Sequence, residues 1–180
     1  MAVLTASVVL VTACSSPQTA PSPAPATSTA DPLDLTEFEK APCGLASPEQ
    51  ITRFYLAAPG TVARSQSIVS CQWSSRDPRA PRYEAAADPH SGGMAGLESR
   101  RSAFPSFERT VIHNYPAAHV KDRSDTVGHS RCTTEVGVTA DTLLVITATV
   151  TERSTTSEDP CDDADRFAGS IIGFQGHRAP

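Results

Sequence analysis

The 180-residue chain is long enough for one domain, and its composition excludes several classes of protein. It has a formal net charge of -5 and contains only six Phe, three Tyr and one Trp, so Ala and Val must supply much of the core packing. Residues 53–131 carry eleven basic and seven acidic side chains, whereas nucleic-acid-binding domains carry clustered Lys and Arg. We therefore expect no nucleic acid among its partners.

The N-terminal segment predicts an exported lipoprotein. Residues 2–11 are all apolar or small, and a helix of that length spans only ~15 Å, too short for a ~30 Å hydrocarbon core. The run ends at Val11-Thr12-Ala13-Cys14, which resembles a bacterial lipobox. We expect residues 1–13 to be a signal peptide and Cys14 to carry lipid, including palmitate, on the extracytoplasmic face of the cell membrane. No Lys or Arg precedes the run, so either the start codon lies further upstream or the amino group alone supplies the positive charge.

A tether is predicted after the lipidated cysteine. From Ser15 to Pro32 the chain has only Ser, Thr, Ala and Pro besides one Gln and one Asp. Such a segment has too little apolar surface to offset the entropy of ordering it. We expect residues 14–39 to be a disordered tether and residues 40–176 to be a single, monomeric globular domain.

The first predicted element of the domain is a helix with signals at both ends. Ser47 is suited to be the N-cap, with Pro48 at the first helical position and Gln50 completing a capping box. Pro59-Gly60 would stop the run. The predicted apolar face comprises Ile51, Phe54 and Tyr55.

The remaining elements alternate between strand and helix patterns. In SIVSCQWSS, apolar and polar residues alternate, which predicts a strand with Cys71 and Trp73 pointing inward. Asp159 is suited to be the N-cap of a C-terminal helix that begins at Pro160. The other predicted elements are a strand at 83–87 after the turn 76–82, a helix within 91–104, strands near 109–113 and 118–122 that flank Tyr115-Pro116, and a hairpin over 132–150 with its turn near Ala140-Asp141.

This order of elements predicts an α+β fold. The short loops and the long terminal hairpin favour an antiparallel sheet of about five or six strands. About three helices would pack mainly on one face of it.

The cysteines predict two disulfides. Beyond Cys14 an even number remains: Cys43, Cys71, Cys132 and Cys161. In an exported domain such a set indicates a disulfide framework, for which three connectivities are possible. The set contains no CxxC pair, and its gaps match no zinc-ligand spacing.

An ordered series of residues resembles a known family. The series is Pro42-Cys43-Gly44-Leu45, Cys71-Gln72-Trp73, RRSAF with Phe107, Tyr115-Pro116-Ala117, Cys132, and Asp159-Pro160-Cys161. Over about residues 40–174 it resembles the actinobacterial lipoproteins grouped as domain-of-unknown-function family 3558. The resemblance implies an extracytoplasmic lipoprotein with two disulfides and supplies no catalytic residues. We predict the pairs Cys43–Cys71 and Cys132–Cys161, because each joins a helix start to a core-facing strand position, as the resemblance also suggests.

No motif predicts an enzyme, a metal site or a cofactor. The five histidines show no metal-binding spacing, although His113 and His119 flank the Tyr115-Pro116 turn. The aspartates near Asp162 lack the EF-hand pattern and suit a helix start. SGGMAG is not a phosphate-binding loop, and its glycines would free the backbone before a helix.

The sequence therefore predicts a binding or accessory module for an envelope protein, polymer or small ligand. An enzyme acting on cell-wall or lipid substrates is the alternative, and a sensor-like ligand-binding domain is a weaker one. The residues assigned to binding are Arg76, Arg79 and Arg82, which suit anionic partners, and Tyr115, which precedes a proline that favours an extended loop. They would form one surface between the arginine turn and the Tyr115-Pro116 loop. The alternatives are that the arginines belong to a solvated turn and that Tyr115 is a core residue under a turn.

Overall fold

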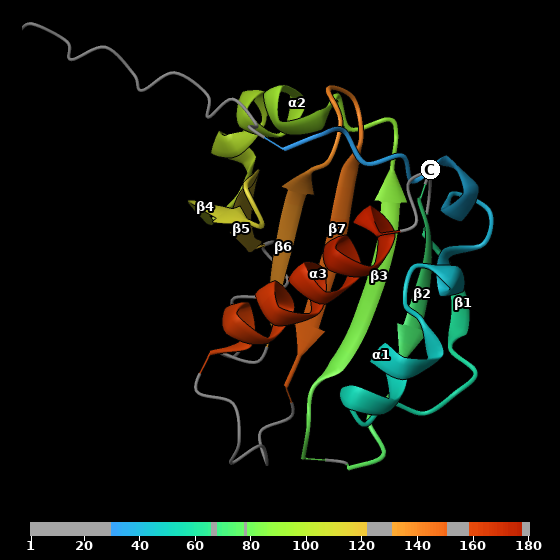
Figure 1. The fold of residues 1–180 in the computed structure, drawn as a ribbon. Coiled ribbons are helices and arrows are strands. Elements are labelled where there is room, and N and C mark those ends of the chain that lie inside the picture. The colour runs from blue at the N-terminus through green and yellow to red at the C-terminus, as the bar shows by residue number, and fades with distance from the viewer. Residues whose placement is uncertain (1–29, 66–67, 78, 122–130, 151–158, 178–180) are drawn as a thin grey trace, which may run out of the picture.

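Seven antiparallel strands form one sheet in the computed structural model, which describes residues 30–65, 68–77, 79–121, 131–150 and 159–177. The strand order is β1-β2-β3-β7-β6-β5-β4, so most neighbours in space are also neighbours in sequence. The fold is α+β, as predicted (Figure 1). The elements are η1 Thr36–Phe38, η2 Pro42–Gly44, α1 Pro48–Arg53, β1 Thr61–Ser65, β2 Ile68–Trp73, β3 Arg82–Asp88, α2 Gly93–Ser99, η3 Arg101–Ala103, β4 Ser106–Ile112, β5 Tyr115–Lys121, β6 Arg131–Gly137, β7 Leu143–Thr149 and α3 Pro160–Gly176.

The strand β1 was absent from the sequence prediction. It lies at the edge of the sheet, and among the described strands it pairs only with β2, from Thr61 opposite Gln72 to Ser65 opposite Ile68. Its residues are exposed or half-buried, so it shows no alternation of buried and exposed side chains. An edge strand without a buried face gives no period-two signal in the sequence.

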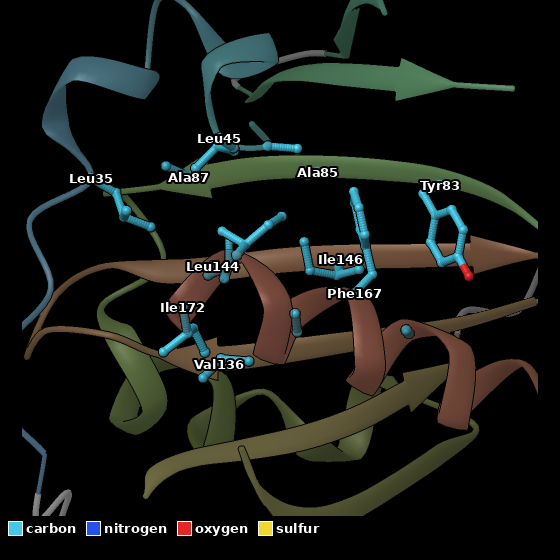
Figure 2. Close-up of a cluster of buried hydrophobic side chains, with 14 of the residues drawn as sticks. Leu35, Leu45, Tyr83, Ala85, Ala87, Val136, Leu144, Ile146, Phe167 and Ile172 are labelled. Atoms are coloured by element: carbon cyan, nitrogen blue, oxygen red, sulfur yellow. The ribbon is translucent and has the colours of Figure 1, made fainter. Parts of the chain in front are cut away.

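The main core lies between one face of the sheet and the helices α1 and α3. The helix α3 crosses β6 and β7, and α1 packs beside it (Figure 1). Phe167 of α3 is fully buried, with its ring centroid 4.6 Å from that of Tyr83 and 5.0 Å from that of Phe54. Ala85 and Ile146 lie beside this ring, and Ala87 lies further along β3, near Leu45 (Figure 2). Four aromatic rings, those of Phe54, Trp73, Tyr83 and Phe167, therefore meet in a core built mostly from Ala, Val, Leu and Ile.

The capping signals of α1 and α3 are confirmed, but α1 is shorter than predicted. The side chains and backbone amides of Ser47 and Gln50 form a reciprocal capping box. Asp159 Oδ1 accepts a hydrogen bond from the Cys161 amide at 2.8 Å. The helix α1 ends at Arg53, and Tyr55 takes a φ of 55° and is 72% exposed. The prediction that Tyr55 lies on the buried face is therefore wrong, because the chain leaves the helix before that residue.

The helix α2 packs on the opposite face of the sheet, where Leu97 joins Ala118, Val120 and Leu143 in a second cluster. The SGGMAG segment that precedes and begins this helix is structural. Gly93 has a φ of 57°, and a Cβ there would lie 2.2 Å from the Ala140 carbonyl oxygen. Its amide donates a hydrogen bond to the Asp141 carbonyl at 3.0 Å. The glycine therefore lets α2 begin against the β6–β7 turn.

Both predicted disulfides are present in the structure. Cys43 of η2 pairs with Cys71 of β2, and Cys132 of β6 pairs with Cys161 of α3. Each bond therefore joins the start of a helical element to a strand of the sheet.

The folded domain begins about ten residues before the predicted boundary at residue 40. Leu33, Leu35 and Phe38 are buried in the main core. The Leu33 amide donates a hydrogen bond to the Val138 carbonyl at 3.0 Å. The folded domain therefore begins near the first leucines that follow the low-complexity segment. The predicted signal peptide, Cys14 and the tether up to residue 29 lie outside the described residues.

Candidate functional site

The arginine-bearing turn lies between β2 and β3. Its Arg76 amide donates a hydrogen bond to the Tyr55 carbonyl at 2.9 Å, and Asp77 Oδ1 accepts one from the Arg79 amide at 2.9 Å. The first bond holds the turn beside the end of α1, and the second lies within the turn. Arg76, Arg79 and Arg82 are all exposed, as a binding role requires, and that role remains a prediction.

Tyr115 is a core residue and is not displayed on a loop. Only 7% of it is exposed, and its hydroxyl donates a hydrogen bond to the Asp31 carbonyl at 2.6 Å. Burial raises the pKa of this phenol, and the charge of Asp31 raises it further. The turn that precedes it consists of His113 and Asn114, which both have positive φ values, so Tyr115 and Pro116 belong to strand β5.

The arginine turn and Tyr115 lie at opposite ends of the sheet. Ala87 faces Leu144 across β3 and β7, and this row continues through Val136 to Ala117 on β5. Tyr115 lies on one side of this row, on β5. Arg82 lies on the opposite side of the row, on β3, where it pairs with Thr149. The offset along the strands is about 23 Å at the usual rise per residue. The single surface that the sequence predicted between them is therefore not formed.

One of the predicted arginines, Arg76, lines a pocket beside α1 together with apolar residues. We call it the α1 pocket; its volume is about 500 Å³. It lies between η2, α1, the segment before β1, and the end of β2. The residues that line it are Cys43, Gly44, Ala46, Ser47, Pro48, Ile51, Thr52, Ala58, Pro59, Gly60, Trp73, Arg76 and Phe174.

Two features of the chain shape the α1 pocket. The Cys43–Cys71 disulfide holds η2 against β2. A Cβ at Gly60 would lie 2.4 Å from Trp73 Nε1 and 2.5 Å from Cys71 Sγ, so only glycine lets the chain pass this close. The backbone after α1 is therefore held directly against the buried Trp73 and the disulfide.

A second, wider hollow of about 920 Å³ runs over the outer surface of α3. Its sides are formed by α1 and the β4–β5 turn, and its floor includes Gly169 and Gly173 of α3. The His113 ring lies over Gly169, 3.1 Å from where a Cβ would stand. Charged residues of both signs line the hollow, among them Glu49, Arg53, Asp165 and Arg166.

A polar cluster lies beneath one end of this hollow. His119 Nε2 lies 2.9 and 3.0 Å from the two oxygens of Asp165, and Thr134 Oγ1 donates a hydrogen bond to Asp165 Oδ1 at 2.7 Å. The hydrogen bond with Asp165 raises the pKa of His119, and the charges of Asp165, Glu108 and Asp159 raise it further, against the opposing effect of burial. This cluster ties α3 to β5 and β6. His113, which flanks the Tyr115-Pro116 turn with His119 in the sequence, takes no part in these bonds.

The described part of the chain contains no group of three or more His, Cys, Asp or Glu side chains placed to hold a metal ion. None of the helices in the described ranges is long and apolar enough to cross a membrane.

Comparison with known proteins now identifies the family. A family model described as "Protein of unknown function (DUF3558)" matches residues 9–173. The chain belongs to this family. The match covers most of the chain and confirms the family that the cysteine-bearing series indicated. No curated protein and no solved structure matches the chain.

Sequence reasoning missed the α1 pocket within this DUF3558 domain. Its lining comes from separate stretches: residues 43–52, residues 58–60, Trp73, Arg76 and Phe174. Most of them are apolar or small and carry no motif. Arg76 was the one member assigned to binding, on its charge and its turn position alone.

Proposed function

We propose that this protein is a membrane-anchored, extracytoplasmic lipoprotein of an actinobacterium that acts as a binding module for a small ligand. The observation that carries the binding role is the α1 pocket, whose volume of about 500 Å³ is in the range of small-molecule sites. Its lining is mostly apolar with a few polar groups, which is also typical of such sites. The two disulfides support an exported location, because disulfides persist in oxidising compartments.

Labelled palmitate should enter the wild-type protein in an actinobacterial host and should not enter the Cys14→Ala variant. The Cys14 thiol would carry the diacylglycerol, and two acyl chains anchor stably because each buried methylene contributes ~0.8 kcal/mol. Membrane fractionation should show the variant released from the membrane. The Cys132→Ala/Cys161→Ala double variant is the control and should still be labelled. Equal labelling of the wild type and Cys14→Ala would contradict the anchor.

The neutral fluorescent probe N-phenyl-1-naphthylamine should bind the full chain at the α1 pocket. Ala57 and Ala58 are adjacent and both exposed, but only Ala58 lines the pocket. Ala58→Phe should therefore block the pocket and weaken probe binding at least about tenfold, because a filled site cannot bury the probe. Ala57→Phe is the matched control and should bind as the wild type does. Both proteins keep the apolar N-terminal run, so binding there cancels in the comparison. Equal binding by the two variants would remove the support for a ligand site here.

A further inference from the structure

We infer that the α1 pocket takes an amphipathic monoanion: an apolar chain or ring that ends in a single oxyanion group. This inference rests on the proposed binding function and names the class of ligand. It is drawn from the lining of the pocket and from the one charge at its edge.

The walls of the pocket suit an apolar group. Most of the residues that line it are apolar, among them Trp73, Ile51 and Phe174. Trp73 is only 2% exposed and Ile51 only 6%, so only the edges of these two side chains reach the pocket, at its base. Apolar ligand surface gains free energy when it leaves water for such a lining. The hydroxyl residues Ser47 and Thr52 have partners of their own: Ser47 Oγ accepts from the Gln50 amide and Thr52 Oγ1 donates to the Pro48 carbonyl.

The charge of the pocket suits an anion. Arg76 is the one charged side chain among the described residues that line it. Its backbone is fixed by the bond between its amide and the Tyr55 carbonyl, while the side chain is exposed. Within the resolved ranges its guanidinium has no ion-pair or hydrogen-bond partner in the protein. A guanidinium offers paired N–H donors that match a carboxylate or a phosphate oxygen pair.

The apolar lining and the single arginine together favour one class of ligand over the others. A neutral apolar ligand would gain nothing from the arginine, and a cation would be repelled by it. A polyanion would find a single positive charge and a mostly apolar surface. An apolar chain with one terminal oxyanion matches both the walls and the edge.

The single tryptophan of the chain supplies the measurement, because Trp73 lines the pocket. Ligand that enters the α1 pocket should change the fluorescence of Trp73. We would titrate the full-length Cys14→Ala protein, with both disulfides formed, with decanoate, decyl phosphate, decanol and decylammonium. Decanoate or decyl phosphate should bind at least about threefold more tightly than decanol, and decylammonium should bind weakest. The stronger of the two anions identifies the oxyanion.

Matched arginine variants of one turn test the role of the charge. Arg76→Gln should weaken binding of the preferred anion about three- to tenfold and leave decanol binding unchanged. Arg79→Gln removes the same charge from an exposed residue that does not line the pocket, so it should bind as the wild type does. Arg76→Lys should restore part of the preference for anions. Higher salt should reduce the advantage of the anions over decanol.

Two results would overturn the inference about the ligand. One is equal affinity for decanol and both anions, and the other is an unchanged anion affinity in Arg76→Gln. If the neutral probe still distinguishes Ala58→Phe from Ala57→Phe, the pocket remains a binding site and only its ligand class is wrong. If that difference is also absent, the proposed function fails as well.

Discussion

Replacing both cysteines of either disulfide should lower the free energy of unfolding by about 3–4 kcal/mol under non-reducing conditions. The sequence separations are 28 residues for Cys43–Cys71 and 29 residues for Cys132–Cys161. Opening a loop of this length returns conformational entropy to the unfolded chain, and the two loops have nearly the same length. The loss is a large part of the stability of a typical domain of ~5–15 kcal/mol.

Urea denaturation of Cys43→Ala/Cys71→Ala and Cys132→Ala/Cys161→Ala, followed by circular dichroism, would measure these losses. The two double variants should be destabilised by similar amounts but differ in function. Only the first should weaken binding of the neutral probe, because the Cys43–Cys71 bond holds η2 at the α1 pocket. A loss below about 1 kcal/mol in both variants would contradict the prediction.

Glu135→Gln should stabilise the protein at neutral pH, by about 2–3 kcal/mol on the scale of ~1.4 kcal/mol per pKa unit. On β6, Glu135 is level with Ala118 and Val145, which belong to the apolar cluster under α2. The pKa of Glu135 is raised to about 7, mainly by burial. The charge of Arg100 lowers this pKa, and the charge of Asp88 raises it. The folded protein therefore holds this proton more tightly than the unfolded chain does.

The effect of Glu135 on stability depends on pH in a defined direction. At pH values below its ordinary pKa of 4.5 the carboxyl is protonated in both states, so it causes no difference. As the pH rises from 4.5 to about 7, the unfolded chain releases the proton first and the folded state loses stability. The advantage of Glu135→Gln should grow over this window and then level off.

Thermal or urea unfolding of the wild type and Glu135→Gln across that pH range would test this. Asp141→Asn is a suitable control, because it removes one negative charge from an exposed residue at the β6–β7 turn. Its stability difference from the wild type should change little over the same window. An advantage of Glu135→Gln that is constant with pH would contradict the prediction, because a buried charge must act through its titration.

Much of the fold follows from local patterns in the sequence. The capping residues Ser47 and Asp159 satisfy backbone amides at helix starts within three residues of themselves. The alternation around Cys71 and Trp73 places both side chains in the core, as period-two spacing requires. Such signals depend on residues that are close together in the sequence, so they can be recognised without a tertiary structure.

The errors in the sequence prediction arise where contacts between residues far apart in the sequence determine the structure. The sequence left open whether Tyr115 is displayed on a loop or buried under a turn, and the binding role rested on the loop. In the structure Tyr115 is buried, and its hydroxyl donates a hydrogen bond to the Asp31 carbonyl. The start of the domain was placed at residue 40, where the resemblance to the family begins, although Leu33 and Leu35 are buried in the main core. Neither contact leaves a local pattern.

The family, the α+β class, the helix starts and, with the family resemblance, the disulfide pairs could all be predicted from the amino-acid sequence. The residues that meet at a site could not be predicted in this way, because they depend on the tertiary structure. It separated Tyr115 from the arginine turn by nearly the length of the sheet, and it brought Arg76 to Trp73 and Ile51 at the α1 pocket. The physical reason is that a pocket is formed by side chains from elements far apart in the chain. The apolar and small residues of these elements are of the same types as the residues of any core, so the sequence does not show that they line a pocket.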